Sequence, residues 1–162
     1  MPSSVYWDSC VWISLFERTA GRIDACEHLV EQATLGQIVI VTSALAIAEV
    51  CRIPGSSAPI EEQCRKIIEY FENDFIAVRS VDRPTAILAN EFARLFGLMP
   101  ADAIHAATAV INNVPEFHTY DASKGRRRGL LRHNGRIGNP PLLIREPPRP
   151  TPGPLFEAKG GR

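Results

Sequence analysis

The sequence lacks three features that would point to a membrane or secreted protein. It has no run of about 18 apolar residues that could span a bilayer. Its N-terminus has no basic segment followed by an apolar run and a small-residue cleavage site. Its cysteines lie far apart and form no Cys-x-x-Cys pair; they are Cys10, Cys26, Cys51 and Cys64. We therefore expect a soluble, cytoplasmic protein with no membrane partner and with buried free thiols.

The 162 residues suffice for one domain with a substantial core, and are too few for two.

A net charge of zero conceals two regions of opposite charge. Residues 1–123 hold 8 Lys and Arg against 16 Asp and Glu, whereas residues 124–162 hold 10 against 2. An acidic body with a basic C-terminal segment suits a metal site beside a surface that binds a polyanion. A plain solvated basic loop would give the same pattern, so both interpretations stay open.

Short β-prone runs alternate with amphipathic segments along the chain. The β-prone runs predict strands near residues 5–7, 38–41, 75–78, 117–120 and 142–144. Apolar residues at three- and four-residue steps, with capping residues and glycine stops, predict helices near 11–16, 23–35, 43–50, 59–71, 82–96 and 101–111. Ser9 is the expected N-cap of the first helix. This order predicts a Rossmann-like three-layer α/β/α sandwich with a mostly parallel sheet of four or five strands.

The last residues differ in composition from the rest of the chain. Residues 147–162 are rich in proline and glycine and contain few apolar side chains. We therefore predict a folded domain over residues 1–146 and a disordered tail over residues 147–162. The large apolar residues Trp12, Leu15 and Phe16 are expected to pack in the core of the domain rather than against a partner.

Four acidic residues stand where the predicted fold would form a site. Asp8 and Asp121 each follow a predicted strand, and the carboxyl ends of parallel strands meet at one edge of a sheet. Glu49 and Asp102 are single carboxylates among apolar residues, where a charge is unfavourable unless it is paired or bound to metal. The basic residues that could pair with them are concentrated after Asp121. Metal is therefore the more natural counter-charge.

Each of these acids also has a local explanation that requires no function. Asp8 and Asp121 could be turn residues, Glu49 a solvated helix residue, and Asp102 a carboxylate favoured by the helix dipole. If the four converge, their mutual repulsion raises their pKa values and favours a divalent cation. Oxygen ligands without His or Cys suit Mg²⁺ or Mn²⁺ better than Zn²⁺. Such an ion activates water and orients a phosphodiester, which predicts hydrolysis.

The acidic motifs together resemble the PIN-domain family, and in particular the small VapC-like ribonuclease toxins of bacterial toxin–antitoxin systems. The four matching segments, in the family's order, are VYWDSCV at 5–11, TSALAIAEV at 42–50, ADAIHAATA at 101–109 and TYD at 119–121. The resemblance extends from about residue 5 to residue 147. It implies a PIN fold, endoribonuclease activity dependent on Mg²⁺ or Mn²⁺, and RNA as substrate. It also implies a homodimer, and a small antitoxin protein whose peptide covers the active site.

The resemblance assigns the catalytic and metal-binding roles to Asp8, Glu49, Asp102 and Asp121. Cys10 and Trp12 replace the small polar and aliphatic residues that are more usual in the first motif, and no second acid follows Asp121 within a turn. The number of metal ions therefore stays open.

Other residues are expected to support these acids. Ser9, Thr119 and His105 are candidates for contacts behind the acids. Ser9 could bond Asp8 or a metal-bound water, or simply cap the helix, and His105 could brace the site from the helical face of Asp102. A basic run could contact RNA phosphates; it comprises Lys124, Arg126, Arg127 and Arg128, followed by Arg132 and Arg136.

Other functions compete with that of a toxin. A non-toxin PIN-domain nuclease could process RNA, and a catalytically silent PIN-like module could bind RNA or protein without cutting. A phosphotransfer enzyme or receiver domain also places acids at strand ends. That alternative is disfavoured because Asp8 is followed by Ser9 and Cys10 and not by a second early acid.

Overall fold

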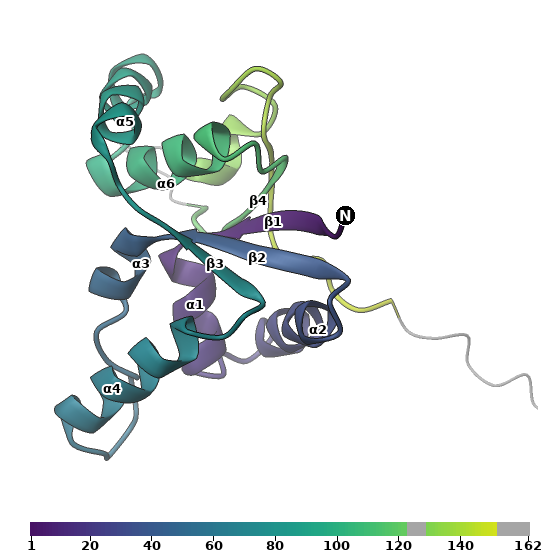
Figure 1. The fold of residues 1–162 in the computed structure, drawn as a ribbon, viewed down its shortest axis with the longest axis vertical. Helices are drawn as coiled ribbons and strands as arrows, with labels where there is room; N and C mark the ends of the chain where they lie inside the picture. The colour runs from purple at the N-terminus through teal and green to yellow at the C-terminus, as the bar shows by residue number, and fades with distance from the viewer. Residues whose placement is uncertain (123–128, 152–162) are drawn as a thin grey trace, which may run out of the picture.

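The chain folds around a parallel five-stranded sheet in the computed structural model (Figure 1). The structure describes residues 1–122 and 129–151. The strands lie in the order β3-β2-β1-β4-β5, and every neighbouring pair is parallel. Their bounds are Ser3–Trp7 for β1, Ile38–Ser43 for β2, Ile76–Arg79 for β3, Glu116–His118 for β4 and Leu143–Arg145 for β5. The predicted α/β class, strand number and parallel pairing are confirmed.

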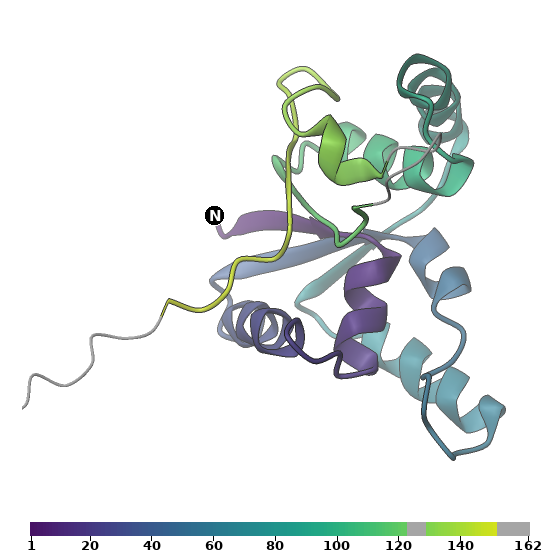
Figure 2. The ribbon, with the colours of Figure 1, turned by 180° about the vertical axis from the view of Figure 1, so that it is seen from behind.

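Helices cover both faces of the sheet, which gives the predicted three layers (Figures 1 and 2). Helices α1, α2 and α4 lie on one face, and α5 and α6 lie on the other. The described helices are α1 Ser9–Phe16, α2 Ile23–Thr34, α3 Ala44–Glu49, α4 Ile60–Phe71, α5 Arg83–Phe96, α6 Pro100–Ile111 and the 3-10 helix η1 Leu130–His133.

The alternation of side chains along the strands divides the core in two. Trp7 points to the face of α1 and α2, where it packs on the buried Trp12 with ring centroids 4.7 Å apart. Tyr6 points to the opposite face, where it stacks on Phe117 at 4.8 Å. This opposition follows from the period of two in a strand. Four buried alanines let α6 lie close to the sheet: Ala103, Ala106, Ala107 and Ala109.

The start of α1 differs from the prediction. Asp8, and not Ser9, is the N-cap, because its carboxylate accepts a hydrogen bond from the backbone N–H of Val11 at 3.3 Å. Ser9 is already the first helical residue. Strand β1 therefore runs into α1 with no intervening turn, and Asp is as effective an N-cap as Ser.

The expectation of buried thiols holds for one cysteine only. All four cysteines are free; Cys26 is buried, Cys10 and Cys64 are half-buried, and Cys51 is exposed. The prediction for Cys51 is wrong because this residue follows the last turn of α3 and lies outside any helical face. As expected, Trp12 is fully buried, and Leu15 and Phe16 pack against the same core.

The C-terminal end is described in part. Pro147 is buried, whereas residues 152–162 lie outside the described residues, so the boundary at residue 146 stays a prediction. The basic residues Lys124, Arg126, Arg127 and Arg128 also lie outside them. Within the described ranges, no helix combines the length and the apolar character needed to cross a bilayer.

Candidate functional site

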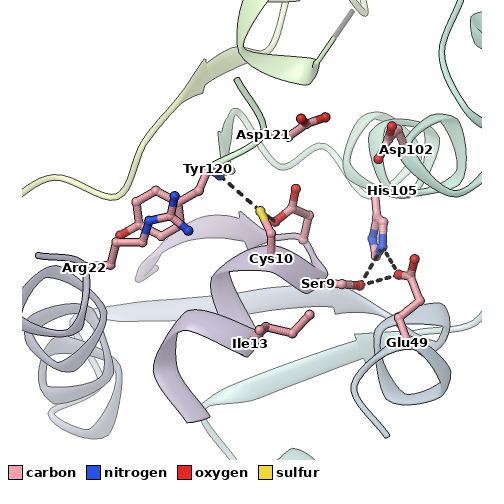
Figure 3. Close-up of a pocket in the computed structure, with 10 residues that line it drawn as sticks. Ser9, Cys10, Ile13, Arg22, Glu49, Asp102, His105, Tyr120 and Asp121 are labelled. Atoms are coloured by element: carbon pink, nitrogen blue, oxygen red, sulfur yellow. Dashed lines mark hydrogen bonds and ion pairs between the residues drawn. The ribbon is translucent and has the colours of Figure 1, made fainter. Parts of the chain in front are cut away.

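All four predicted acids line one pocket of about 510 Å³ (Figure 3). Asp8 follows β1, Glu49 ends α3, Asp102 lies in the first turn of α6, and Asp121 follows β4. The pocket is therefore at the carboxyl edge of the sheet, as in other open parallel sheets. Ser9, Cys10, Ile13, Arg22, His105 and Tyr120 complete its lining.

Asp8 is the most enclosed of the four acids, with an exposed fraction of 4%. Burial raises the pKa of its carboxyl group, although hydrogen bonds from Cys10 and Thr119 and the nearby His105 oppose this effect. The Cys10 thiol donates to Asp8 Oδ1 at 2.8 Å. The same sulfur accepts a hydrogen bond from the Tyr120 N–H at 3.1 Å, so Cys10 joins Asp8 to the chain after β4.

Glu49 is held by hydrogen bonds from two sides. Its Oε2 accepts one from the Ser9 hydroxyl and one from His105 Nε2, the latter at 2.7 Å. Partial burial raises the pKa of Glu49, but the hydrogen bonds from His105 and Ser9 outweigh it and the net shift is downward. Glu49 is therefore ionised at neutral pH. Ser9 thus bonds Glu49, and not Asp8 as one sequence-based alternative had it.

The two ring nitrogens of His105 have different partners, Tyr6 and Glu49. The Tyr6 hydroxyl lies 2.7 Å from His105 Nδ1. Burial raises the pKa of Tyr6 well above its ordinary value, so it remains a phenol. Because the Glu49 carboxylate can only accept, Nε2 carries the proton that is donated to it, and in a neutral ring Nδ1 then accepts from the Tyr6 hydroxyl. His105 contacts the site as expected, but through Glu49.

Asp102 is surrounded by negative charge. Burial, followed by the charges of Asp121 and Asp8, raises the pKa of its carboxyl group to about 6. Asp121 is placed by Thr119, whose hydroxyl accepts a hydrogen bond from the Asp121 N–H at 3.0 Å. Thr119 also lies 3.4 Å from the Cys10 sulfur. The predicted supporting role of Thr119 thus has a geometric basis, in the turn that presents Asp121.

The donor chemistry of the pocket fits a hard divalent cation. Within residues 1–122 and 129–151, no three His, Cys, Asp or Glu side chains are close enough together to form an assembled metal centre. The carboxylates nevertheless supply the oxygen ligands that Mg²⁺ and Mn²⁺ prefer. After burial, the negative charges of Asp121 and Asp8 contribute to the raised pKa of Asp102. A bound divalent ion would reduce this repulsion.

Arg22 and Tyr120 are pocket residues that the sequence did not single out. Tyr120 is adjacent to Asp121, and that adjacency was an available signal. No local pattern identifies Arg22, which lies in the turn between α1 and α2 and reaches the pocket only after the chain has folded.

Comparisons with known proteins agree with this arrangement. The family model "PIN domain" matches residues 5–127. No curated protein sequence matches the chain. Three solved structures resemble it with a TM-score of 0.58, at identities too low to show more than the fold.

The first of these structures is the Mycobacterium tuberculosis toxin VapC20, described as cleaving the sarcin-ricin loop, with 15% identity over 76% of this chain and 98% of that one. A toxin–antitoxin complex from Klebsiella pneumoniae has 18% identity over 90% and 99%. VapBC2 from Rickettsia felis, bound to a DNA fragment from its promoter, has 15% identity over 88% and 98%. The family model spans most of the chain and includes Asp8, Glu49, Asp102 and Asp121. The chain belongs to the PIN-domain family.

Proposed function

We propose that this protein is a metal-dependent endoribonuclease that hydrolyses RNA phosphodiester bonds, and that it is the toxin of a toxin–antitoxin pair. The observation that carries the proposal is the presence of four carboxylates, from four different parts of the fold, in one pocket. The resemblance in fold to VapC20, described as a toxin that cleaves the sarcin-ricin loop, supports the choice of RNA as substrate.

The pocket residues have distinct roles in this proposal. Asp8, Asp102 and Asp121 would hold Mg²⁺ or Mn²⁺, with Glu49 at the edge of the metal site. A bound divalent ion would lower the pKa of water and stabilise charge on the leaving oxygen. Glu49, kept ionised by Ser9 and His105, would orient the attacking water or take its proton. The protonated thiol of Cys10 would hold the Asp8 carboxylate in place.

The proposed partners are an RNA substrate, a small antitoxin protein and a second copy of the chain. Lys124, Arg126, Arg127 and Arg128 remain candidates for RNA contacts. Three exposed apolar residues support a homodimer: Ile87 and Leu95 on α5, and Met99 just before α6. The complexes from Klebsiella pneumoniae and Rickettsia felis support an antitoxin.

Cleavage by antitoxin-free protein tests the proposal. Purified chain is incubated with a panel of structured RNAs, with Mn²⁺, Mg²⁺ or EDTA. We expect cleavage with either ion, none in EDTA and none with Asp102→Asn. Asp74→Asn is the matched control, because Asp74 is exposed and lies outside the pocket. Circular dichroism establishes that both variants are folded.

The contrary result would change the assigned function. If no RNA is cut under any condition, the proposed nuclease function is wrong, and a silent PIN-like binding module becomes the better description. Cleavage that persists in EDTA or with Asp102→Asn would exclude the proposed chemistry. Co-purification with a small partner that stops cleavage would distinguish a toxin from an RNA-processing nuclease.

A further inference from the structure

We propose that Arg22 binds a backbone phosphate of the RNA, adjacent to the bond that is cut. Arg22 would be a substrate-binding residue on the side of the pocket opposite Asp102 and Glu49. This inference rests on the proposed function, because it assumes that RNA enters this pocket.

The Arg22 side chain is held in place by two neighbours. Its guanidinium carbon lies 4.2 Å from the centroid of the Tyr120 ring. Its Nη1 donates to the Ser14 hydroxyl at 3.3 Å, and that hydroxyl in turn donates to the Cys10 carbonyl at 2.8 Å. Ser14 is 2% exposed, so this contact is shielded from water. Arg22 is thus fixed to the same helix, α1, that carries Ser9 and Cys10 into the site.

The position of Arg22 complements that of the acids. In Figure 3, Arg22 and Tyr120 lie on one side of Cys10, and Asp102, His105 and Glu49 lie on the other. A phosphodiester whose scissile bond is near the acids would extend its next linkage across Cys10 toward Arg22. Backbone contacts of this kind fix the register of a nucleic acid without reading its sequence.

The charge of the pocket explains why such a cation is needed. Among its described lining residues, Arg22 is the sole Lys or Arg, against four carboxylates. The four carboxylates alone carry a formal charge of −4, and one divalent ion would leave −2. A phosphate would still be repelled from such a pocket unless a positive group lay at the point of entry.

The guanidinium has N–H groups that can bind a phosphate. It makes no ion pair with a carboxylate among the described residues; its neighbours there are the Ser14 hydroxyl and the Tyr120 ring. Tyr120 covers one face of the planar group, whereas a phosphate binds at its edge through two N–H groups. A residue that only braced Tyr120 would not need N–H groups available for a phosphate.

RNA binding under conditions that prevent cleavage tests this inference. A short, labelled, single-stranded RNA is titrated with the Asp102→Asn protein in Mg²⁺, and anisotropy is measured over a range of salt concentrations. We expect Arg22→Gln in this background to weaken binding about tenfold. The slope of log Kd against log salt should fall by about 0.7, as for the loss of one phosphate contact to a single strand.

Two further variants separate charge from structure. Arg22→Lys should keep the salt slope, because the positive charge remains. Arg65→Gln removes one charge from α4, outside the pocket lining, and should leave affinity and slope unchanged. A residue that only braces Tyr120 would lower the melting temperature without changing the salt slope.

Neutral methylphosphonate linkages, introduced one at a time, identify the phosphate. Asp102→Asn protein with Arg22 should lose affinity at one linkage beside the cleavage site, and the Arg22→Gln variant should lose nothing further there. Equal affinity and slope for the two proteins would overturn the inference, as would an absence of RNA binding by both. Cleavage by wild-type protein is measured separately, so failure of the nuclease function is distinguished from failure of the Arg22 contact.

Discussion

Two buried histidines, His105 and His118, lie on opposite faces of the sheet, each between an aromatic side chain of β1 and a glutamate. The neighbours of the two glutamates differ. His105 accepts a hydrogen bond from Tyr6 and contacts Glu49 at 2.7 Å. His118 accepts one from Trp7 at 3.2 Å and contacts Glu116 at 2.6 Å. Tyr6 and Trp7 are consecutive residues of β1, so one strand orients both rings.

The difference lies in what neutralises each glutamate. Glu116 also accepts a hydrogen bond from Arg145 Nε at 2.6 Å, which completes an ion pair next to β4. Glu49 has no Lys or Arg partner among the described residues, and it faces the acidic pocket. Similar local arrangements therefore give a glutamate paired with Arg145 on one face of the sheet. On the other face they give a glutamate that has no Lys or Arg partner among the described residues and lines the candidate site.

The largest expected effect is the loss of activity when Glu49, which lines the pocket, is changed. Glu49→Gln should reduce RNA cleavage by about a thousandfold, because the amide cannot accept a proton from water. Its carbonyl oxygen can still accept the hydrogen bonds from Ser9 and His105, so the melting temperature should change little. Single-turnover cleavage and thermal unfolding measure the two effects. Unchanged cleavage would remove Glu49 from the mechanism and end the functional contrast with Glu116.

A loss of stability without a loss of activity is expected when Glu116 is changed. Glu116→Gln should lower the free energy of unfolding by about 2 kcal/mol, because His118 and Arg145 lose a charged acceptor. Cleavage measured well below the melting temperature should equal that of the wild type. Urea denaturation and the same cleavage assay test this. The exposed Glu31→Gln on α2 is the matched control for the lost charge. A large loss of cleavage in folded Glu116→Gln protein would contradict the distinction.

The smallest expected effect is a pH dependence of stability that arises from Asp102, beside Glu49 in the pocket. Burial and the charges of Asp121 and Asp8 raise the pKa of Asp102 from 3.8 to about 6 in the folded protein. The protonated carboxyl group of Asp102 therefore makes its full contribution to the free energy of unfolding below pH 3.8. This contribution is lost as the pH rises through about 6.

Asp102→Asn removes this pH-dependent contribution. In EDTA at pH 7.5, the variant should be more stable than the wild type by about 1 kcal/mol. This value is reduced because solvent screens a partly exposed group. The difference in stability should disappear near pH 4. Urea denaturation across pH measures the difference. Added Mg²⁺ should stabilise the wild type alone. A variant less stable than the wild type at pH 7.5 in EDTA would show that repulsion does not dominate at Asp102.

Much of the candidate site could be anticipated because its acids lie at positions that topology dictates. Asp8 and Asp121 follow strands, and parallel strands bring their carboxyl ends to one edge. The exposure of Cys51 could not be anticipated in the same way, because the end of α3 was not apparent from apolar spacing. The N-cap role of Asp8 was missed since Asp and Ser are equivalent caps and adjacent in the sequence.

The partners of the acids, in contrast, depend on side chains from distant segments. The three-residue spacing of Asp102 and His105 correctly suggested a shared helical face, but His105 bonds Glu49, 56 positions earlier in the chain. Arg22 reaches the pocket from a surface turn by stacking on Tyr120. No sequence pattern encodes such contacts, because their energy arises only when the elements pack.

The order of strands and helices, the parallel sheet and the four acidic positions could be derived from the sequence, because hydrophobic periodicity and strand ends are local properties. The bonds of Glu49 to Ser9 and His105, the pairing of Glu116 with Arg145 and the place of Arg22 in the pocket arise only in the folded chain. The physical reason is that hydrogen bonds and pKa shifts depend on distance and burial, which exist only once the chain has folded.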